Sequence, residues 1–359
     1  MLTAAAIAAG SSCKDGKKIT VSGLDPQNFV TEVDGKTTGL YTLTNSNGME
    51  VCVTNFGGRI VSVMVPDRNG VMTDVVLGFD NILDYLPANN QTDFGASIGR
   101  YANRIAQGRI VIDGDTIQLP QNNYGHCLHG GPDGWQYKVY DVEQTNDSTV
   151  VLTLTSPDGD NNFPGTVNAK VTYTLMPDNA IDIAYEATTD KPTVINMTNH
   201  SYFNLNGDPD KAITDNVMLI DASQFTPTDS TFMTTGEIWA VEGTPMDFTA
   251  ERVIGDSIDS EYAQTVWGKG YDHNWILNTA GDDNEVAVKL TSPETGIVLE
   301  VLTDEPGIQV YTGNFLDGTV TGKGGKVYNK RAAICLAPQH YPASPNTREW
   351  PSVRLNPGD

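Results

Sequence analysis

Alternation of apolar and polar residues with a period of two is the feature that most constrains this chain. It is clearest at 171–175, 181–186 and 286–290, where Val, Ile, Leu and Tyr alternate with smaller or polar residues. This period is that of a β-strand with one face on a core and the other in solvent. Turn sequences rich in Pro, Gly, Asp and Asn, as at 66–70 and 177–179, recur between such segments. The sequence therefore predicts many short strands joined by tight turns.

Helical patterns are scarce, and short helices are expected only at 81–86 and 250–258. The chain has 359 residues, of which 39% are hydrophobic, and this is enough apolar material for a large core. No repeat, heptad or Pro/Ser-rich linker divides it after about residue 20. We expect residues 1–20 to be a flexible N-terminus or a signal remnant. Residues 21–359 are expected to form one large all-β domain, an antiparallel sandwich of several sheets.

The charge balance argues against several partners. Lys and Arg number 22 against 45 Asp and Glu, which gives a net charge of −23. A nucleic-acid-binding protein normally carries a basic stripe, and anionic lipid attracts polybasic segments, so neither partner is expected. No apolar run approaches the ~20 residues that span a bilayer. The acidity favours solubility and suits a neutral small-molecule ligand.

The first residues resemble the end of a bacterial lipoprotein signal, in which small residues precede a Cys that is lipidated after cleavage. Residues 1–10 are small and apolar and Cys13 follows shortly, although the usual basic residues before the apolar stretch are missing. We therefore expect an exported lipoprotein, anchored at Cys13 in the periplasm or at the outer membrane. A plain N-terminus on a cytoplasmic protein is the alternative. The remaining cysteines show neither CxxC nor zinc spacing, and Cys52 and Cys335 are expected to be buried free thiols.

The five histidines lie in segments rich in Gly, Asn, Tyr or Pro, and we expect them on loops above the strand scaffold. His200 lies in 196–205, which is dense in hydrogen-bonding and aromatic side chains; its imidazole can transfer protons near neutral pH, or be purely structural. His129 precedes two glycines, which let backbone come close to a ligand. Further metal ligands are not nearby in the sequence, so no metal site is expected.

Two further segments carry polar groups suited to a carbohydrate. Asn103 and Arg104 lie among small residues, where a guanidinium can act as a planar donor for hydroxyls, or simply lie on the surface of a turn. Asp272 lies between aromatic residues; carboxylates bind sugar hydroxyls and ring faces cover the C–H surface, although a turn beside a buried Trp is the alternative. The chain has no GxSxG, GxGxxG or GxxxxGK[ST] motif, so neither a serine hydrolase nor a nucleotide cofactor is expected.

Seven segments, taken in order, resemble those of the aldose 1-epimerases, also called galactose mutarotases. The resemblance runs from about Gly35 to Pro357 and is carried by 65–68, 74–79, 98–105, 128–131, 198–205, 271–274 and 311–316. It implies a β supersandwich and the interconversion of the α and β anomers of free aldohexoses such as glucose and galactose, without a cofactor. Ring opening needs a base for the C1 hydroxyl proton and an acid for the ring oxygen.

The resemblance also implies roles for individual residues. His200 corresponds to the acid that protonates the ring oxygen, and His129 to the histidine that binds and polarises the sugar. Arg104, with Asn103 beside it, corresponds to the basic substrate ligand. Asp272 corresponds to the carboxylate that holds ring hydroxyls, and Gln309 to a polar contact near C1.

One departure from the family pattern concerns the base. The family has a Glu where this chain has Ala337, within Cys-Leu-Ala-Pro-Gln-His, and the Asp usual before Ser-Pro-Asn is Ala343. A methyl group cannot take a proton, and losing a positioned base costs ~10²–10⁴-fold in rate. Three explanations are open. Either the position was engineered to trap substrate, or the protein is a sugar-binding relative without useful catalysis, or another carboxylate acts as the base. Glu305, which is near Gln309 in the sequence, is the obvious candidate for that base.

These alternatives make different predictions. A mutarotase accelerates the exchange of anomers, whereas a binding protein holds the sugar and leaves the exchange at the buffer rate. A different reaction on a related sugar is also open. A structural or partner-binding β domain predicts no sugar affinity, and so many desolvated polar groups would then be costly.

Overall fold

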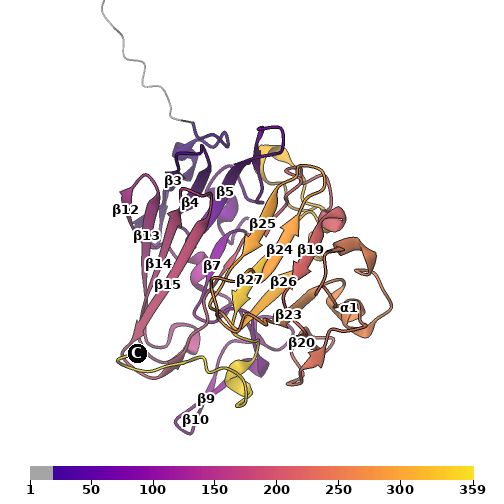
Figure 1. Ribbon diagram of the computed structural model, residues 1–359. Helices are drawn as coiled ribbons and strands as arrows, with labels where there is room; N and C mark the ends of the chain where they lie inside the picture. Colours follow the sequence, from indigo (N-terminus) through magenta and orange to yellow (C-terminus); the bar gives the residue numbers. More distant parts are fainter. Residues whose placement is uncertain (1–18) are drawn as a thin grey trace, which may run out of the picture.

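The computed structural model describes residues 19–359, and the predicted all-β architecture is confirmed (Figure 1). Cys13 and most of the predicted N-terminal segment lie outside the described residues, so the boundary at residue 20 and the lipid anchor stay predictions. Between residues 19 and 359, no helix combines the length and apolar character that crossing a bilayer requires.

One sheet of six strands forms a wall of the candidate site. Its ladders are antiparallel, and its order is β18 (Tyr202–Phe203), β27 (Ile334–Gln339), β26 (Gly307–Tyr311), β23 (Asp272–Ile276), β20 (Gln224–Thr226) and β21 (Trp239–Ala240). In Figure 1 its central strands lie to the right of the long strands β12–β15.

Three four-stranded sheets make up most of the remaining structure. Their orders are β12 (Asp141–Asn146), β13 (Thr149–Ser156), β14 (Val167–Leu175) and β15 (Ile181–Thr189); β22 (Arg252–Val253), β19 (Val217–Ile220), β24 (Val288–Thr291) and β25 (Val298–Val301); and β3 (Leu40–Thr44), β4 (Glu50–Thr54), β5 (Arg59–Pro66) and β6 (Met72–Asp74).

Short two-stranded ladders connect these sheets. They are β1 (Glu32–Val33) with β2 (Lys36–Thr37), β9 (Arg109–Ile112) with β10 (Asp115–Gln118), β8 (Arg104–Ile105) with β11 (Cys127–Leu128), β16 (Thr193–Val194) with β28 (Arg354–Leu355), and β7 (Ala96–Ile98) with β17 (Thr198–His200). The β7–β17 ladder lies beside β27. The hydroxyl of Thr198 in β17 donates to the carbonyl of Pro338 in β27 at 2.6 Å.

The period-two prediction is confirmed where the strands are half-buried. Along β14 the side chains alternate between buried and more exposed, and β15 continues the pattern through nine paired residues. The predicted segment 286–290 is only partly strand, because β24 begins at Val288. One hydrophobic cluster contains residues from the six-stranded sheet and from all three four-stranded sheets. Each fully buried Val, Leu or Ile contributes ~1.5–3 kcal/mol to the stability of the fold.

Across residues 19–359, helical structure is limited to short 3₁₀ turns and one six-residue α-helix. The predicted helices at 81–86 and 250–258 are shorter 3₁₀ turns, η2 (Leu83–Tyr85) and η7 (Ile254–Asp256). The prediction missed α1 (Ala263–Gly268), because six residues are too few to show a helical period. The helix ends at Lys269, whose backbone lies in the left-handed region at φ 56°. The other 3₁₀ turns are η1 (Pro26–Phe29), η3 (Ala106–Gly108), η4 (Trp135–Tyr137), η5 (Asp160–Asn162), η6 (Ile213–Asp215), η8 (Lys323–Gly325) and η9 (Ser344–Asn346).

Within the described part of the chain, the cysteines are buried free thiols: Cys52, Cys127 and Cys335. This confirms the prediction for Cys52 and Cys335. Burial raises the pKa of Cys52 to about 11 and that of Cys127 to about 12, so both stay protonated at neutral pH.

Candidate active site

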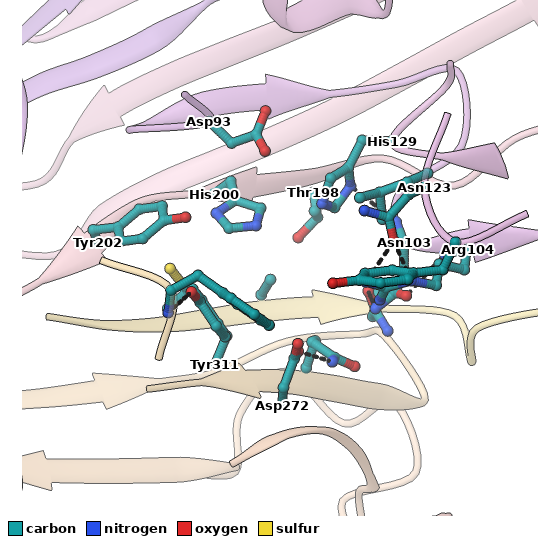
Figure 2. Close-up of a pocket in the computed structure, with 17 residues that line it drawn as sticks. Asp93, Asn103, Arg104, Asn123, His129, Thr198, His200, Tyr202, Asp272 and Tyr311 are labelled. Atoms are coloured by element: carbon teal, nitrogen blue, oxygen red, sulfur yellow. Dashed lines mark hydrogen bonds between the residues drawn. The ribbon is translucent and has the colours of Figure 1, made fainter. Parts of the chain in front are cut away.

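A cavity of about 240 Å³ opens between the six-stranded sheet and the β7–β17 ladder (Figure 2). The predicted site residues that line it are Asn103, Arg104, His129, His200, Asp272, Gln309 and Ala337. Segments more than 200 residues apart in the chain therefore contribute to one cavity, as the resemblance implied.

His200 is the last residue of β17, where it pairs with Ala96 of β7. It therefore ends a strand, and the expectation that it lies on a loop was wrong. Its ring stacks on Tyr202 at 5.2 Å between centroids and meets His129 edge-on at 5.1 Å. Burial lowers the pKa of His200 below its usual value near 6.5, while the Asp93 carboxylate acts in the opposite direction. The ring is thus predominantly neutral at pH 7, and its buried Nδ1 has no hydrogen-bond partner among the described residues.

His129 is held in one tautomer. The backbone N–H of Asn103 donates to its Nδ1 at 3.1 Å, so the neutral ring carries its proton on Nε2. Burial lowers the pKa of His129 to about 3, which keeps the ring neutral. His129 is therefore suited to donating a hydrogen bond to a ligand oxygen.

The glycines after His129 serve the fold rather than the approach of a ligand. A side chain at Gly130 would place its Cβ 2.2 Å from the carbonyl oxygen of Gly99, and one at Gly131 would meet Asn161 at 2.8 Å. The interpretation that these glycines admit a ligand is therefore corrected: they let the His129 loop pack against neighbouring backbone and side chains.

Arg104 is fixed from two sides. Its Nε and Nη2 both donate to Oδ1 of Asn123, at 3.2 and 3.1 Å, and its guanidinium lies 5.3 Å from the centroid of the Phe232 ring. Oδ1 of Asn103 accepts the Arg104 backbone N–H at 2.8 Å, and its amide donates to Gln339 at 3.4 Å. The guanidinium of Arg104 is therefore a buried cation with a fixed orientation beside the cavity.

Asp272 and Gln309 form a pair on the opposite wall. Asp272 begins β23, so the alternative of a turn does not hold, and His273, expected on a loop, lies within this strand. The Gln309 amide donates to Oδ1 of Asp272 at 2.7 Å. Burial raises the pKa of Asp272, while Arg104 and the Gln309 hydrogen bond oppose that shift. Oε1 of Gln309 is buried, has no donor within the described part of the chain, and can accept from a ligand hydroxyl.

Ala337 lies in β27 directly opposite Gln309 of β26. Its methyl group borders the cavity, so a side chain at this position would enter it. Glu305 is not among the residues that line the cavity. Its Oε2 lies 2.6 Å from Nδ1 of His340, so the structure commits this carboxylate to a partner outside the cavity.

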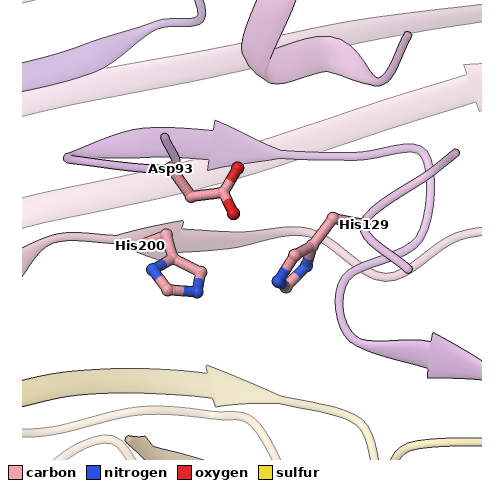
Figure 3. Close-up of side chains that lie close together, drawn as sticks. All are labelled: Asp93, His129 and His200. Atoms are coloured by element: carbon pink, nitrogen blue, oxygen red, sulfur yellow. The ribbon is translucent and has the colours of Figure 1, made fainter. Parts of the chain in front are cut away.

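Asp93 was missed by the sequence analysis. It precedes β7 in a turn closed by the Ala96 N–H on the Asp93 carbonyl at 3.0 Å. One of its carboxylate oxygens and one nitrogen of each of His129 and His200 lie within 4.8 Å of one another (Figure 3). The cluster Asp93, His129 and His200 has the composition of a metal site, but the Nδ1 of His129 is already engaged and its Nε2 carries a proton. This favours a donor role over metal ligation.

The profile of the family described as aldose 1-epimerase matches residues 39–359. The chain belongs to the aldose 1-epimerase family. This confirms the resemblance found in the sequence.

Individual relatives of the aldose 1-epimerase family cover nearly the whole chain. Galactose mutarotase from Rattus norvegicus is 38% identical over 314 residues, which are 88% of this chain and 89% of the relative. Aldose 1-epimerase from Escherichia coli is 37% identical over 329 residues, 91% of this chain and 93% of the relative. The crystal structure of an aldose epimerase homologue from C. elegans superimposes with a TM-score of 0.82 at 30% identity, covering 90% of this chain and 95% of that one.

Proposed function

We propose that this chain binds the cyclic form of a free aldohexose in the cavity and interconverts its α and β anomers. The observation that carries the proposal is the convergence of His200, His129 and Arg104 with Asp272 and Gln309 around about 240 Å³ of space. Donors and acceptors on both walls match the hydroxyl groups of a sugar. The names of the relatives, galactose mutarotase and aldose 1-epimerase, support the same substrate class.

The reaction needs only proton transfers. A base takes the C1 hydroxyl proton, the C1–ring oxygen bond breaks, and an acid protonates the ring oxygen. Rotation about C1–C2 and closure on the other face of the carbonyl give the other anomer. His200 is the acid in this proposal, His129 and Arg104 donate to sugar oxygens, and Asp272 with Gln309 holds the ring hydroxyls.

Ala337 favours a second candidate, a sugar-binding protein without useful catalysis. Its methyl group stands where the family places its base, and this loss costs ~10²–10⁴-fold in rate when nothing replaces the base. Sugar affinity is common to both candidates, so only the rate of anomer exchange separates them.

Polarimetry on freshly dissolved α-D-glucose and α-D-galactose tests the proposal. This chain is compared with its Ala337→Glu variant and with buffer, and binding is measured in parallel by saturation-transfer NMR. Acceleration by either protein supports a mutarotase scaffold. Binding without acceleration in the natural chain, with a fast variant, supports the binding protein. Absence of sugar binding in both proteins would overturn the proposal.

We further propose that Cys13 carries a lipid anchor that holds the protein at the bacterial envelope. The small apolar residues before Cys13 support this. Expression in a bacterium followed by membrane fractionation and mass spectrometry tests it: the natural chain should be lipid-modified and membrane-bound, and Cys13→Ser should not. Unmodified protein in the cytosolic fraction would contradict it.

A further inference from the structure

The proposed reaction constrains where its base can lie. The C1 hydroxyl oxygen and the ring oxygen are bonded to the same carbon, so the base and the acid must lie within a few ångströms of each other. Each must also come within hydrogen-bond reach of its own oxygen, about 2.6–3.2 Å. Among the described residues that line the cavity, the carboxylates are Asp93 and Asp272.

Asp272 is occupied with another task. Its Oδ1 accepts the amide of Gln309 at 2.7 Å, and it lies in the field of Arg104. It is also not part of the cluster that brings a carboxylate near both histidines. These contacts suit a group that binds ring hydroxyls on the wall formed by β23 and β26.

Asp93 has the opposite character. Its Oδ1 is buried and has no hydrogen-bond donor among the described residues. Figure 3 shows its carboxylate directed toward the space between His129 and His200, and the nearest atoms of the three groups lie within 4.8 Å of one another. Groups this close to one another can each reach one of the two oxygens that a single hemiacetal carbon carries.

The fixed tautomer of His129 determines how a hydroxyl would bind there. Its Nε2–H donates, so a hydroxyl oxygen between His129 and Asp93 accepts from the ring and directs its own proton at the carboxylate. His200 then remains for the ring oxygen. A hydroxyl bound in this way is polarised toward loss of its proton.

We infer that Asp93 is the catalytic base of this chain and replaces the carboxylate missing at position 337. The inference rests on the proposed mutarotase function. Asp93 takes the C1 hydroxyl proton, the released electron pair forms the C1 carbonyl, the C1–ring oxygen bond breaks, and the ring oxygen takes a proton from the imidazolium form of His200. The neighbouring Asp93 and Asp272 carboxylates favour that protonated form. Closure runs the same transfers in reverse, so no co-reactant is consumed.

Asp93→Asn tests the inference, because the amide keeps the shape and cannot accept the proton in the same way. The substitution should lower the catalysed rate constant at saturating α-D-galactose ~10²–10⁴-fold in polarimetry. Sugar affinity should fall by no more than roughly 10–100-fold, the loss expected for one hydrogen bond to a charged group. Asp141→Asn is the matched control, since that carboxylate is 71% exposed in an ion pair with Lys36 and should leave the rate unchanged.

Two variants distinguish loss of the base from loss of the fold. Ala337→Glu in the Asp93→Asn background supplies a carboxylate from β27 and should restore catalysis. In Asp93→Ala, sodium formate should restore part of the rate by acting as a diffusible base, which a merely structural role would not allow.

The failures of the two ideas are distinguishable. Full activity in Asp93→Asn overturns the role of Asp93 and leaves the mutarotase function intact. This chain at the buffer rate, with a fast Ala337→Glu variant, overturns both the role of Asp93 and the proposed catalysis, and leaves the sugar-binding protein as the function. Absence of sugar binding in every variant overturns the proposed function, and the role of Asp93 with it.

Discussion

The backbone N–H of Asn103 donates to Nδ1 of His129 at 3.1 Å, and this single contact makes the ring a donor toward the cavity. His126 makes the same kind of contact outside the cavity, where its Nδ1 accepts from the backbone N–H of Gln107 at 3.0 Å. The two histidines therefore share a local geometry and differ in what their other nitrogen faces.

His129→Phe should weaken sugar binding about ten-fold or more, because the sugar oxygen loses its Nε2–H donor and is left unpaired in the cavity, at ~1–3 kcal/mol. The affinity for galactose, measured by NMR titration, checks this. His126→Phe removes an equivalent backbone contact and should leave the affinity unchanged. Equal losses in both variants would show that the effect is structural and not specific to the cavity.

Asp272→Asn should weaken sugar binding through the loss of charge. Hydrogen bonds to charged groups contribute ~1.5–3 kcal/mol, which corresponds to roughly 10–100-fold in affinity. Asn can still accept the Gln309 amide, so the wall should keep its shape. Asp259→Asn is the control, since Asp259 pairs with Arg331 and does not line this cavity. An unchanged affinity in Asp272→Asn would remove Asp272 from the binding site.

Much of the fold could be predicted from the sequence because β14 has one buried face and β15 one partly buried face, and both therefore show a period of two. β4 and β23 could not, because nearly every side chain in them is buried and the alternation disappears. The sequence therefore left a turn open at Asp272, although this residue begins a strand.

The site could be predicted as far as its motifs extend. Asp93, Asn123 and Gln339 were missed, because their place depends on how separate segments pack. Asp93 faces His200 only because β7 pairs with β17, and this register is set by the fold. For the same reason Glu305 looked suitable from its closeness to Gln309 in sequence, while the structure pairs it with His340.

The stability of the protein should fall on acidification below about pH 6.5, in part because of His273. Burial lowers its pKa to about 3 in the folded state, against ~6.5 in the unfolded chain. Between these values the unfolded chain binds more protons, so the free energy of unfolding falls with falling pH. His273→Gln should show a shallower fall than the natural chain in urea unfolding at pH 7 and pH 4.5. Identical slopes would show that His273 does not titrate differently on unfolding.

Ala343 stores backbone strain that a glycine should relieve. It precedes η9 with φ 61°, in the left-handed region that costs a residue with a Cβ ~1–2 kcal/mol. Ala343→Gly removes this cost and loses ~0.5–1 kcal/mol of chain entropy, so a net gain in stability of up to about 1 kcal/mol is expected. Ala333→Gly is the control: Ala333 is equally buried without a positive φ, and this substitution should destabilise. Chemical denaturation of both variants measures the difference, and destabilisation by Ala343→Gly would show that the methyl group packs more favourably than its backbone strain costs.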